Sequence, residues 1–247
     1  IVAFEALLRL KKHVQMNENI YDIITYAEQS GSMVHLGDFI FSEGMKFAKS
    51  IQETGAGVSL NVSPVQLMQA GFVDNFLKLY HSYGLKPGAV SIEVTESFLM
   101  TTMEETLRKL EILRANGIDV HLDDFGTTYS SLKYLKELPI SAIKIDRSFV
   151  YDIEENFNSE TISELVLNLS AKLGVESICE GVETLGQLKR LRSLGADIIQ
   201  GFIISKAVPG DTARDMLENY RFNEKAIAEA EAEAQKQQIA EPAEENS

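Results

Sequence analysis

The fold of this chain is decided by residues 142–180, which read AIKIDRSFVYDIEENFNSETISELVLNLSAKLGVESICE. The segment begins and ends with short apolar runs, Ala142–Asp146 and Glu176–Cys179, that have the length of buried strands. Between them, apolar residues recur at three- and four-residue steps, at Ile162, Leu165, Val166, Leu169 and Leu173. This period predicts a helix with one apolar face, and Gly174 suits the left-handed cap that ends such a helix. The segment therefore predicts a strand, a helix and a parallel strand.

The same alternation of apolar runs and helical stretches extends outward to both ends of the chain. Further strands are expected at Val2–Leu8, Gly57–Val62, Val90–Thr95, Asp119–Asp123 and Ile198–Gly201. Repeated units of this kind predict an α/β protein with a parallel sheet, and an α/β barrel commonly occupies roughly 250 residues. The chain has 247 residues, 45% of them apolar, which is enough for one domain of that size.

We expect one domain over residues 1–222 and a tail over residues 223–247. The tail is rich in Ala, Glu, Gln and Lys and contains no aromatic residue. It can bury little surface, so a solvated helix or disorder is expected. Ile1 stands where an initiator Met would be, so we expect the chain to be a segment of a longer protein.

Charge and cysteine content argue against several functional classes. The chain has 23 basic and 37 acidic residues, a net charge of −14, which argues against a general grip on DNA or RNA. A single cysteine, Cys179, excludes a disulfide framework and favours the reducing cytoplasm. No stretch approaches the roughly 20 apolar residues that span a bilayer. We therefore expect no direct membrane contact from this segment, although the full-length parent could be membrane-anchored.

Acidic and amide side chains stand at the ends of most of the expected strands: Glu5, Asn61, Glu93, Asp123, Asp124, Glu180 and Gln200. In a parallel barrel the ends of successive strands meet on one face, so these side chains are expected to share a site. Oxygen donors without His or Cys companions are typical of Mg²⁺ or Mn²⁺ rather than zinc. The paired Asp123 and Asp124 add the possibility of two ions, which can activate a water against a phosphodiester. The alternative is that each acid only caps a helix.

Lys144 lies inside an otherwise apolar strand. Burying a lysine without anionic partners is costly, so we expect its side chain to point into the carboxylate cluster. There it could orient a water or stabilise charge that develops on phosphorus. A surface lysine whose ammonium reaches solvent is the alternative.

At this point the chain resembles the EAL-domain cyclic di-GMP phosphodiesterases over most of its length. The motifs occur in order as Glu5-Ala6-Leu7-Leu8-Arg9, Asn61-Val62-Ser63-Pro64, Glu93-Val94-Thr95-Glu96-Ser97, Asp123-Asp124-Phe125-Gly126, Lys144-Ile145-Asp146, Glu180-Gly181-Val182-Glu183-Thr184 and Gln200-Gly201. The resemblance implies a TIM-like (β/α)8 barrel whose first strand runs antiparallel to the others. It also implies hydrolysis of cyclic di-GMP to linear pGpG with two Mg²⁺ or Mn²⁺ ions in each active site.

The resemblance also implies a role for each matched residue. The implied metal ligands are Glu5, Asn61, Glu93, Asp123, Asp124 and Glu180. Catalytic roles are implied for Lys144, Glu180, Glu183 and Glu96, the last bracing the loop at residues 125–131. Substrate contacts are implied for Leu7, Arg9, Asp146 and Gln200. A homodimer near the 125–131 loop and an upstream sensor or GGDEF-type domain in the full-length protein are further implications.

Departures from the family pattern concern the substrate rather than the metals, and one of them is the absence of the usual prolines from Ile20 to Thr25. Leu10 stands where Trp is usual, Thr128 replaces a glycine, and Lys206-Ala207 replaces Arg-Pro. If position 128 needs a positive φ, the β-branched Thr128 is strained there, and turnover could be slow. The alternative function is therefore a cyclic di-GMP receptor with little activity that regulates a linked or partner protein. A third hypothesis is a barrel enzyme that uses Mg²⁺ and lysine to abstract a proton next to a carboxylate.

Overall fold

The computed structural model describes residues 1–9, 20–96, 103–127 and 135–229. Leu10, Thr128 and most of the expected tail lie outside these ranges, so the expectations placed on them stay predictions. The division of the chain at residue 222 also stays a prediction.

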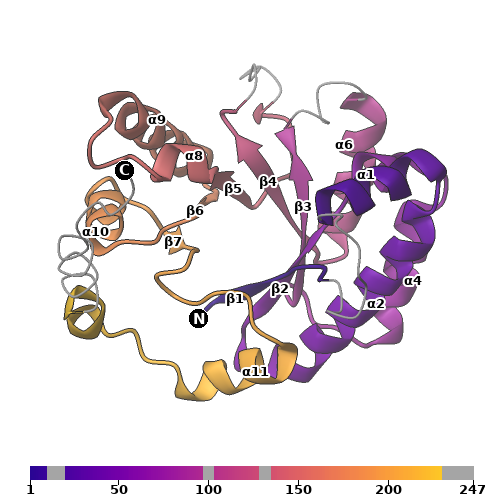
Figure 1. The fold of residues 1–247 in the computed structure, drawn as a ribbon. Coiled ribbons are helices and arrows are strands. Elements are labelled where there is room, and N and C mark those ends of the chain that lie inside the picture. The colour runs from indigo at the N-terminus through magenta and orange to yellow at the C-terminus, as the bar shows by residue number, and fades with distance from the viewer. Residues whose placement is uncertain (10–19, 97–102, 128–134, 230–247) are drawn as a thin grey trace, which may run out of the picture.

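The centre of the molecule is one sheet of seven strands whose spatial order follows the sequence, β1 to β7. The strands are β1 (Ala3–Ala6), β2 (Gly57–Asn61), β3 (Val90–Thr95), β4 (Asp119–Phe125), β5 (Ala142–Ile145), β6 (Glu176–Cys179) and β7 (Ile198–Ile199). Figure 1 shows the sheet curling, with the helices around its outer side. In the described residues no strand pairing joins β7 to β1, so the sheet forms part of a barrel wall with two open edges.

Every described strand pair is parallel, including β1 with β2, in which Glu5 is in register with Ser59. The expectation of an antiparallel first strand is therefore wrong for this chain. The physical reason lies in the connection from β1 to β2. It contains α1 (Ile20–Ser30) and α2 (Met33–Ile51), and a helical crossover returns the chain to the same end of the sheet, so β2 runs in the direction of β1.

The remaining helices follow the strands in the expected alternation. They are α3 (Pro64–Met68), α4 (Phe72–Ser82), α6 (Met103–Ala115), α8 (Arg147–Val150), α9 (Phe157–Leu173), α10 (Leu185–Ser193) and α11 (Gly210–Asn219), with a 3-10 turn, η1, at Gln52–Thr54. Gly174 ends α9 in the left-handed conformation, as its position predicts. In the described residues, no helix has both the length and the apolar character needed to cross a membrane.

Alternation along the strands separates the core from the barrel interior. Leu60, Ile92, Leu122 and Ile143 are fully buried and belong to one apolar cluster that also contains helix residues such as Met45. Because successive strand side chains point to opposite faces, the residues between them point to the other face. That inner face carries the polar residues expected to form the site.

Candidate active site

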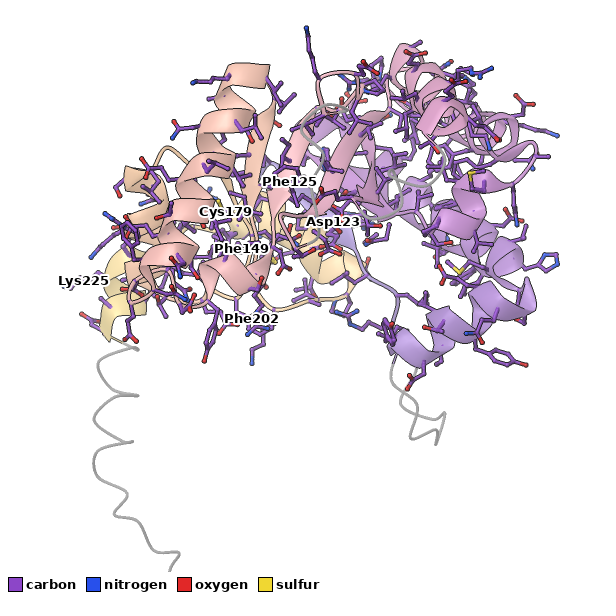
Figure 2. The ribbon with its side chains drawn as sticks, turned by 90° about the horizontal axis from the view of Figure 1, so that it is seen from above. Asp123, Phe125, Phe149, Cys179, Phe202 and Lys225 are labelled. Carbon is purple, nitrogen blue, oxygen red and sulfur yellow. The ribbon has the colours of Figure 1, made fainter. Side chains whose placement is uncertain are left out.

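The candidate site lies inside the curl of the sheet, where the strands end. Figure 2 shows Asp123 in this position, surrounded by side-chain oxygens. The strand register aligns the site residues, since Asn61 pairs with Glu93 and Thr95 pairs with Asp123. Residues far apart in sequence are thus brought to one end of the sheet.

Lys144 is the centre of the buried part of the site. Its ammonium lies 2.5 Å from Glu93, 2.7 Å from Glu180 and 3.3 Å from Asp123. Only 1% of Lys144 and 3% of Glu93 is exposed. We call Glu93, Asp123, Lys144 and Glu180 the Lys144 cluster. The structure thus brings together the lysine and three of the acids that the sequence singles out, and it excludes the alternative of a surface lysine.

The Lys144 cluster carries more negative than positive charge. Burial raises the pKa of Glu93 to about 7, against the opposing effect of Lys144, and burial likewise raises the pKa of Glu180 to about 7. Burial alone would lower the pKa of Lys144, but Glu93, Glu180 and Asp123 together hold it above its ordinary value. Lys144 therefore stays charged, while the acids retain a site where further positive charge is favourable.

Asp124 adopts an unusual backbone conformation next to this cluster. Its φ is +55°, the only positive φ of a non-glycine residue in the described ranges. The pairing of β4 with β5 shifts register between Leu122 and Phe125, which accommodates the turned residue. The backbone N–H of Asp124 donates to Asp123 at 3.0 Å. Strained backbone of this kind concentrates at functional sites.

A second group of side chains joins the open edges of the sheet. The amide of Asn61 donates to one oxygen of Glu5 at 2.8 Å, and the amide of Gln200 donates to the other at 2.6 Å. We call Glu5, Asn61 and Gln200 the Glu5 cluster. It connects β1, β2 and the end of β7, and Asn61 is exposed.

Three other predicted site residues have defined partners. Glu96 is buried and accepts from the backbone N–H of Gly126 at 3.2 Å, which fits its predicted role in bracing the following loop. Glu183 pairs with Arg147 at 2.9 Å. Asp146 caps α8 by accepting from Ser148 at 2.9 Å, so here the helix-cap alternative describes the contact that is seen.

The two residues after β1 that are predicted to contact substrate are exposed. Leu7 is 42% exposed, and Arg9 is also exposed and donates to the neighbouring carbonyl of Leu8 at 2.9 Å. Among the described residues, neither side chain contacts the clusters described above.

Two residues with direct contacts to the site were missed by sequence reasoning. Ser59 donates to Glu93 at 2.5 Å from the buried inner face of β2. Arg147 pairs with Glu183 and packs so closely that a Cβ on Gly181 would lie 2.3 Å from its Cγ. The sequence could have indicated Ser59, because it lies two residues before Asn61 and side chains two apart on a strand share a face.

The chemistry of the cluster fits a hard divalent cation. In the Lys144 cluster three carboxylates surround one ammonium, and the Glu5 cluster adds a carboxylate and two amides, so all the ligand candidates offer oxygen. In the ranges that the structure describes, however, no group of three or more His, Cys, Asp or Glu residues is arranged to hold a metal ion. The ammonium of Lys144 provides the positive charge at the centre of the carboxylates, so ion binding would require these side chains to adjust.

Comparison with known proteins gives a consistent family. The model of the EAL domain family matches residues 1–207. The cyclic di-GMP phosphodiesterase NbdA of Pseudomonas aeruginosa is 33% identical over 222 residues, which cover 89% of this chain and 28% of NbdA. The bifunctional diguanylate cyclase/cyclic di-GMP phosphodiesterase MucR of the same organism is 32% identical, over 85% of this chain and 31% of MucR. The chain thus spans less than a third of these two relatives.

Solved structures confirm the expected fold class. The PaMucR phosphodiesterase in complex with c-di-GMP superposes with a TM-score of 0.80 and 32% identity, covering 85% of this chain and 86% of that chain. Klebsiella pneumoniae BlrP1, in a manganese and cyclic di-GMP complex, superposes with a TM-score of 0.62 and 28% identity, covering 76% of this chain and 45% of that chain. BlrP1 is also known in a calcium and cyclic di-GMP complex.

Proposed function

Because this chain belongs to the EAL domain family, we propose that it hydrolyses cyclic di-GMP to linear pGpG with the help of two Mg²⁺ or Mn²⁺ ions. The proposal rests on the Lys144 cluster, in which one buried ammonium contacts three carboxylates at the end of the sheet. The names of NbdA and MucR, and the manganese and cyclic di-GMP in BlrP1, support the same substrate and cofactor class.

The proposed mechanism assigns the ligands in two groups. Glu5, Asn61, Glu93 and Asp123 would hold one ion, and Asp123, Asp124 and Glu180 would hold the other. When bound, two such ions activate a water and stabilise the oxygens of a phosphodiester during in-line displacement.

The remaining side chains are assigned to binding the dinucleotide and orienting the attacking water. Lys144 limits repulsion among the carboxylates, and its positive charge would stabilise negative charge that develops on the attacked phosphate. Glu183, held by Arg147, accepts a hydrogen bond from the water. Arg9 binds a phosphate oxygen through its planar guanidinium. Leu7, Asp146 and Gln200 complete the surface that contacts the dinucleotide.

We further propose that the domain works in the cytoplasm as part of a larger signalling protein. MucR is named for both a cyclase and a phosphodiesterase activity, which supports a sensor or GGDEF-type domain linked to this one. A homodimer would form near the loop that begins at Phe125, which Glu96 braces at Gly126.

A turnover assay with Mg²⁺ or Mn²⁺ and chromatographic detection of pGpG tests the proposal. Wild-type protein is expected to form pGpG, and Asp123→Asn is expected to abolish the product. The matched control is Asp119→Asn, because Asp119 lies on the same strand but pairs with Arg114 outside the site. Binding of cyclic di-GMP without product would reject the enzyme and favour the receptor. Activity on an organic acid without any response to cyclic di-GMP would favour proton abstraction.

A further inference from the structure

Ser59 is a buried polar residue whose hydroxyl serves one carboxylate of the site. Its side chain lies on the inner face of β2, only 4% of the residue is exposed, and its Oγ donates to Oε1 of Glu93 at 2.5 Å. The contact is therefore a specific hydrogen bond rather than loose packing of a small polar residue.

The two oxygens of Glu93 are held by different residues on different strands. Ser59 donates to Oε1 from β2, while the Lys144 ammonium donates to Oε2 at 2.5 Å from β5. Two donors from two strands fix the rotation of the carboxylate about its last bond. Each carboxylate oxygen has two lone pairs, so the serine leaves one on Oε1 free for an ion.

We propose that Ser59 is a positioning residue that holds Glu93 in the orientation needed to ligate a divalent cation. The inference rests on the proposed function, because it assigns Glu93 as a metal ligand. Ser59 does not contact the ion and acts only through Glu93. Hydrogen-bond partners of ligating groups typically change metal affinity about 10–100-fold when they are removed.

A purely structural role for Ser59 makes a different prediction, and the neighbouring strand offers the control. Ser91 is in register with Ser59, and only 7% of it is exposed. In the part of the chain that the structure describes, the side-chain hydrogen bonds to Glu93 come from Ser59 and Lys144 and not from Ser91. If burial of a small polar residue in the barrel were all that mattered, the two serines would respond alike to loss of the hydroxyl.

The experiment compares Ser59→Ala, Ser91→Ala and Ser59→Thr in the full chain. Mn²⁺ affinity is measured by calorimetric titration, and unfolding by urea is measured without metal. We expect Ser59→Ala to bind Mn²⁺ about 10–100-fold more weakly, Ser91→Ala to match the wild type, and Ser59→Thr to regain most of the affinity because it keeps a hydroxyl. Turnover of Ser59→Ala should recover at saturating Mn²⁺.

Four results would overturn the proposal, and the last of them would also overturn the proposed function. Wild-type Mn²⁺ affinity in Ser59→Ala would overturn it, as would equal losses in both alanine variants. If Ser59→Thr folds but binds Mn²⁺ no more tightly than Ser59→Ala, the hydroxyl is not what supports metal affinity. If the wild type binds Mn²⁺ and forms no pGpG, the proposed function fails while the affinity comparison still decides the role of Ser59. A wild type that binds no Mn²⁺ overturns both.

Discussion

The two halves of the site are built on different principles. In the Lys144 cluster a buried ammonium on β5 contacts carboxylates on β3 and β4 and one directly after β6. In the Glu5 cluster two neutral amides donate to one carboxylate at the open edges of the sheet. The first half depends on buried charge, which is costly to leave unpaired, and the second on hydrogen bonds near solvent, which are each worth little.

This difference teaches where the site is sensitive. A change in the Lys144 cluster should affect both folding and function, because it leaves charges buried without partners. A change in the Glu5 cluster should affect the site with a smaller loss of stability. The four predictions below test this contrast.

The largest effect is expected from Lys144→Met, which keeps the length of the side chain but removes its charge. Three carboxylates would lose their common partner, so we expect the free energy of unfolding to fall by about 3–5 kcal/mol and turnover to be lost. Urea unfolding measures the first and pGpG formation the second. Lys86→Met is the control, because the Lys86 and Glu53 side chains are 58% and 76% exposed. It should change stability by less than about 1 kcal/mol. Equal losses in the two variants would contradict the contrast.

Gly201→Ala should give the next largest effect, by breaking the Glu5 cluster through the backbone. A Cβ at this position would lie 2.1 Å from the carbonyl oxygen of Val182, and backbone cannot move aside cheaply. We expect a loss of about 1–3 kcal/mol and reduced metal affinity, since Gln200 would shift away from Glu5. Gly195→Ala is the control. Gly195 has a positive φ, as Gly201 does, but a Cβ there would meet no atom within 4 Å. This variant should therefore lose stability without losing metal affinity. Unchanged metal binding in Gly201→Ala would show that the position of Gln200 against Glu5 does not affect metal affinity.

The pH dependence of metal binding should report the Lys144 cluster. The pKa values of Glu93 and Glu180 are raised to about 7, and an ion must displace their protons below that pH. Mn²⁺ affinity should therefore fall by up to about tenfold per pH unit for each protonated carboxylate as pH decreases below 7. Titrations between roughly pH 5.5 and 8 measure the slope.

Without metal, the stability of the protein should change with pH in the opposite direction to Mn²⁺ affinity. Both carboxyl groups have a higher pKa folded than unfolded, so their contribution to stability is complete below the ordinary value of 4.5 and is lost as pH rises through about 7. Glu180→Gln should flatten both the affinity slope and this stability loss. A slope that is unchanged in Glu180→Gln would show that Glu180 does not titrate in this range.

The smallest effect is expected from Gln200→Ala. It removes one hydrogen bond, at 2.6 Å, from a Glu5 side chain that still accepts from Asn61. Because no buried charge is left without a partner, we expect a loss of about 0.5–1.5 kcal/mol in urea unfolding. A loss as large as that of Lys144→Met would show that the two halves do not differ.

Much of the fold could be predicted because buried strands leave a local signal. The expected bounds of β3 and β6, Val90–Thr95 and Glu176–Cys179, agree with the structure. The antiparallel direction expected for β1 was implied by the family resemblance alone, and it is wrong, whereas the alternation of strands and helices in the sequence predicts the parallel pairing that β1 makes with β2. Its orientation depends on the long helical connection to β2.

The candidate site was predictable where a residue type contradicts its surroundings. Lys144 stands out in an apolar strand, and its expected position among carboxylates is confirmed by the contacts. Ser59 was missed because serine in a strand contradicts nothing, and only the register of β2 with β3 brings it to Glu93. The functional roles of these residues stay predictions until they are measured.

The hydrogen bond between Gln200 and Glu5 joins residues 195 positions apart. Closing so long a loop carries an entropic cost that only a largely folded chain can offset, so this contact should form late in folding. The amide of Gln200 thus holds the Glu5 side chain on β1 only after the strands between them have formed. A nascent or partly folded chain would lack the completed Glu5 cluster, which couples the competence of the site to completion of the fold.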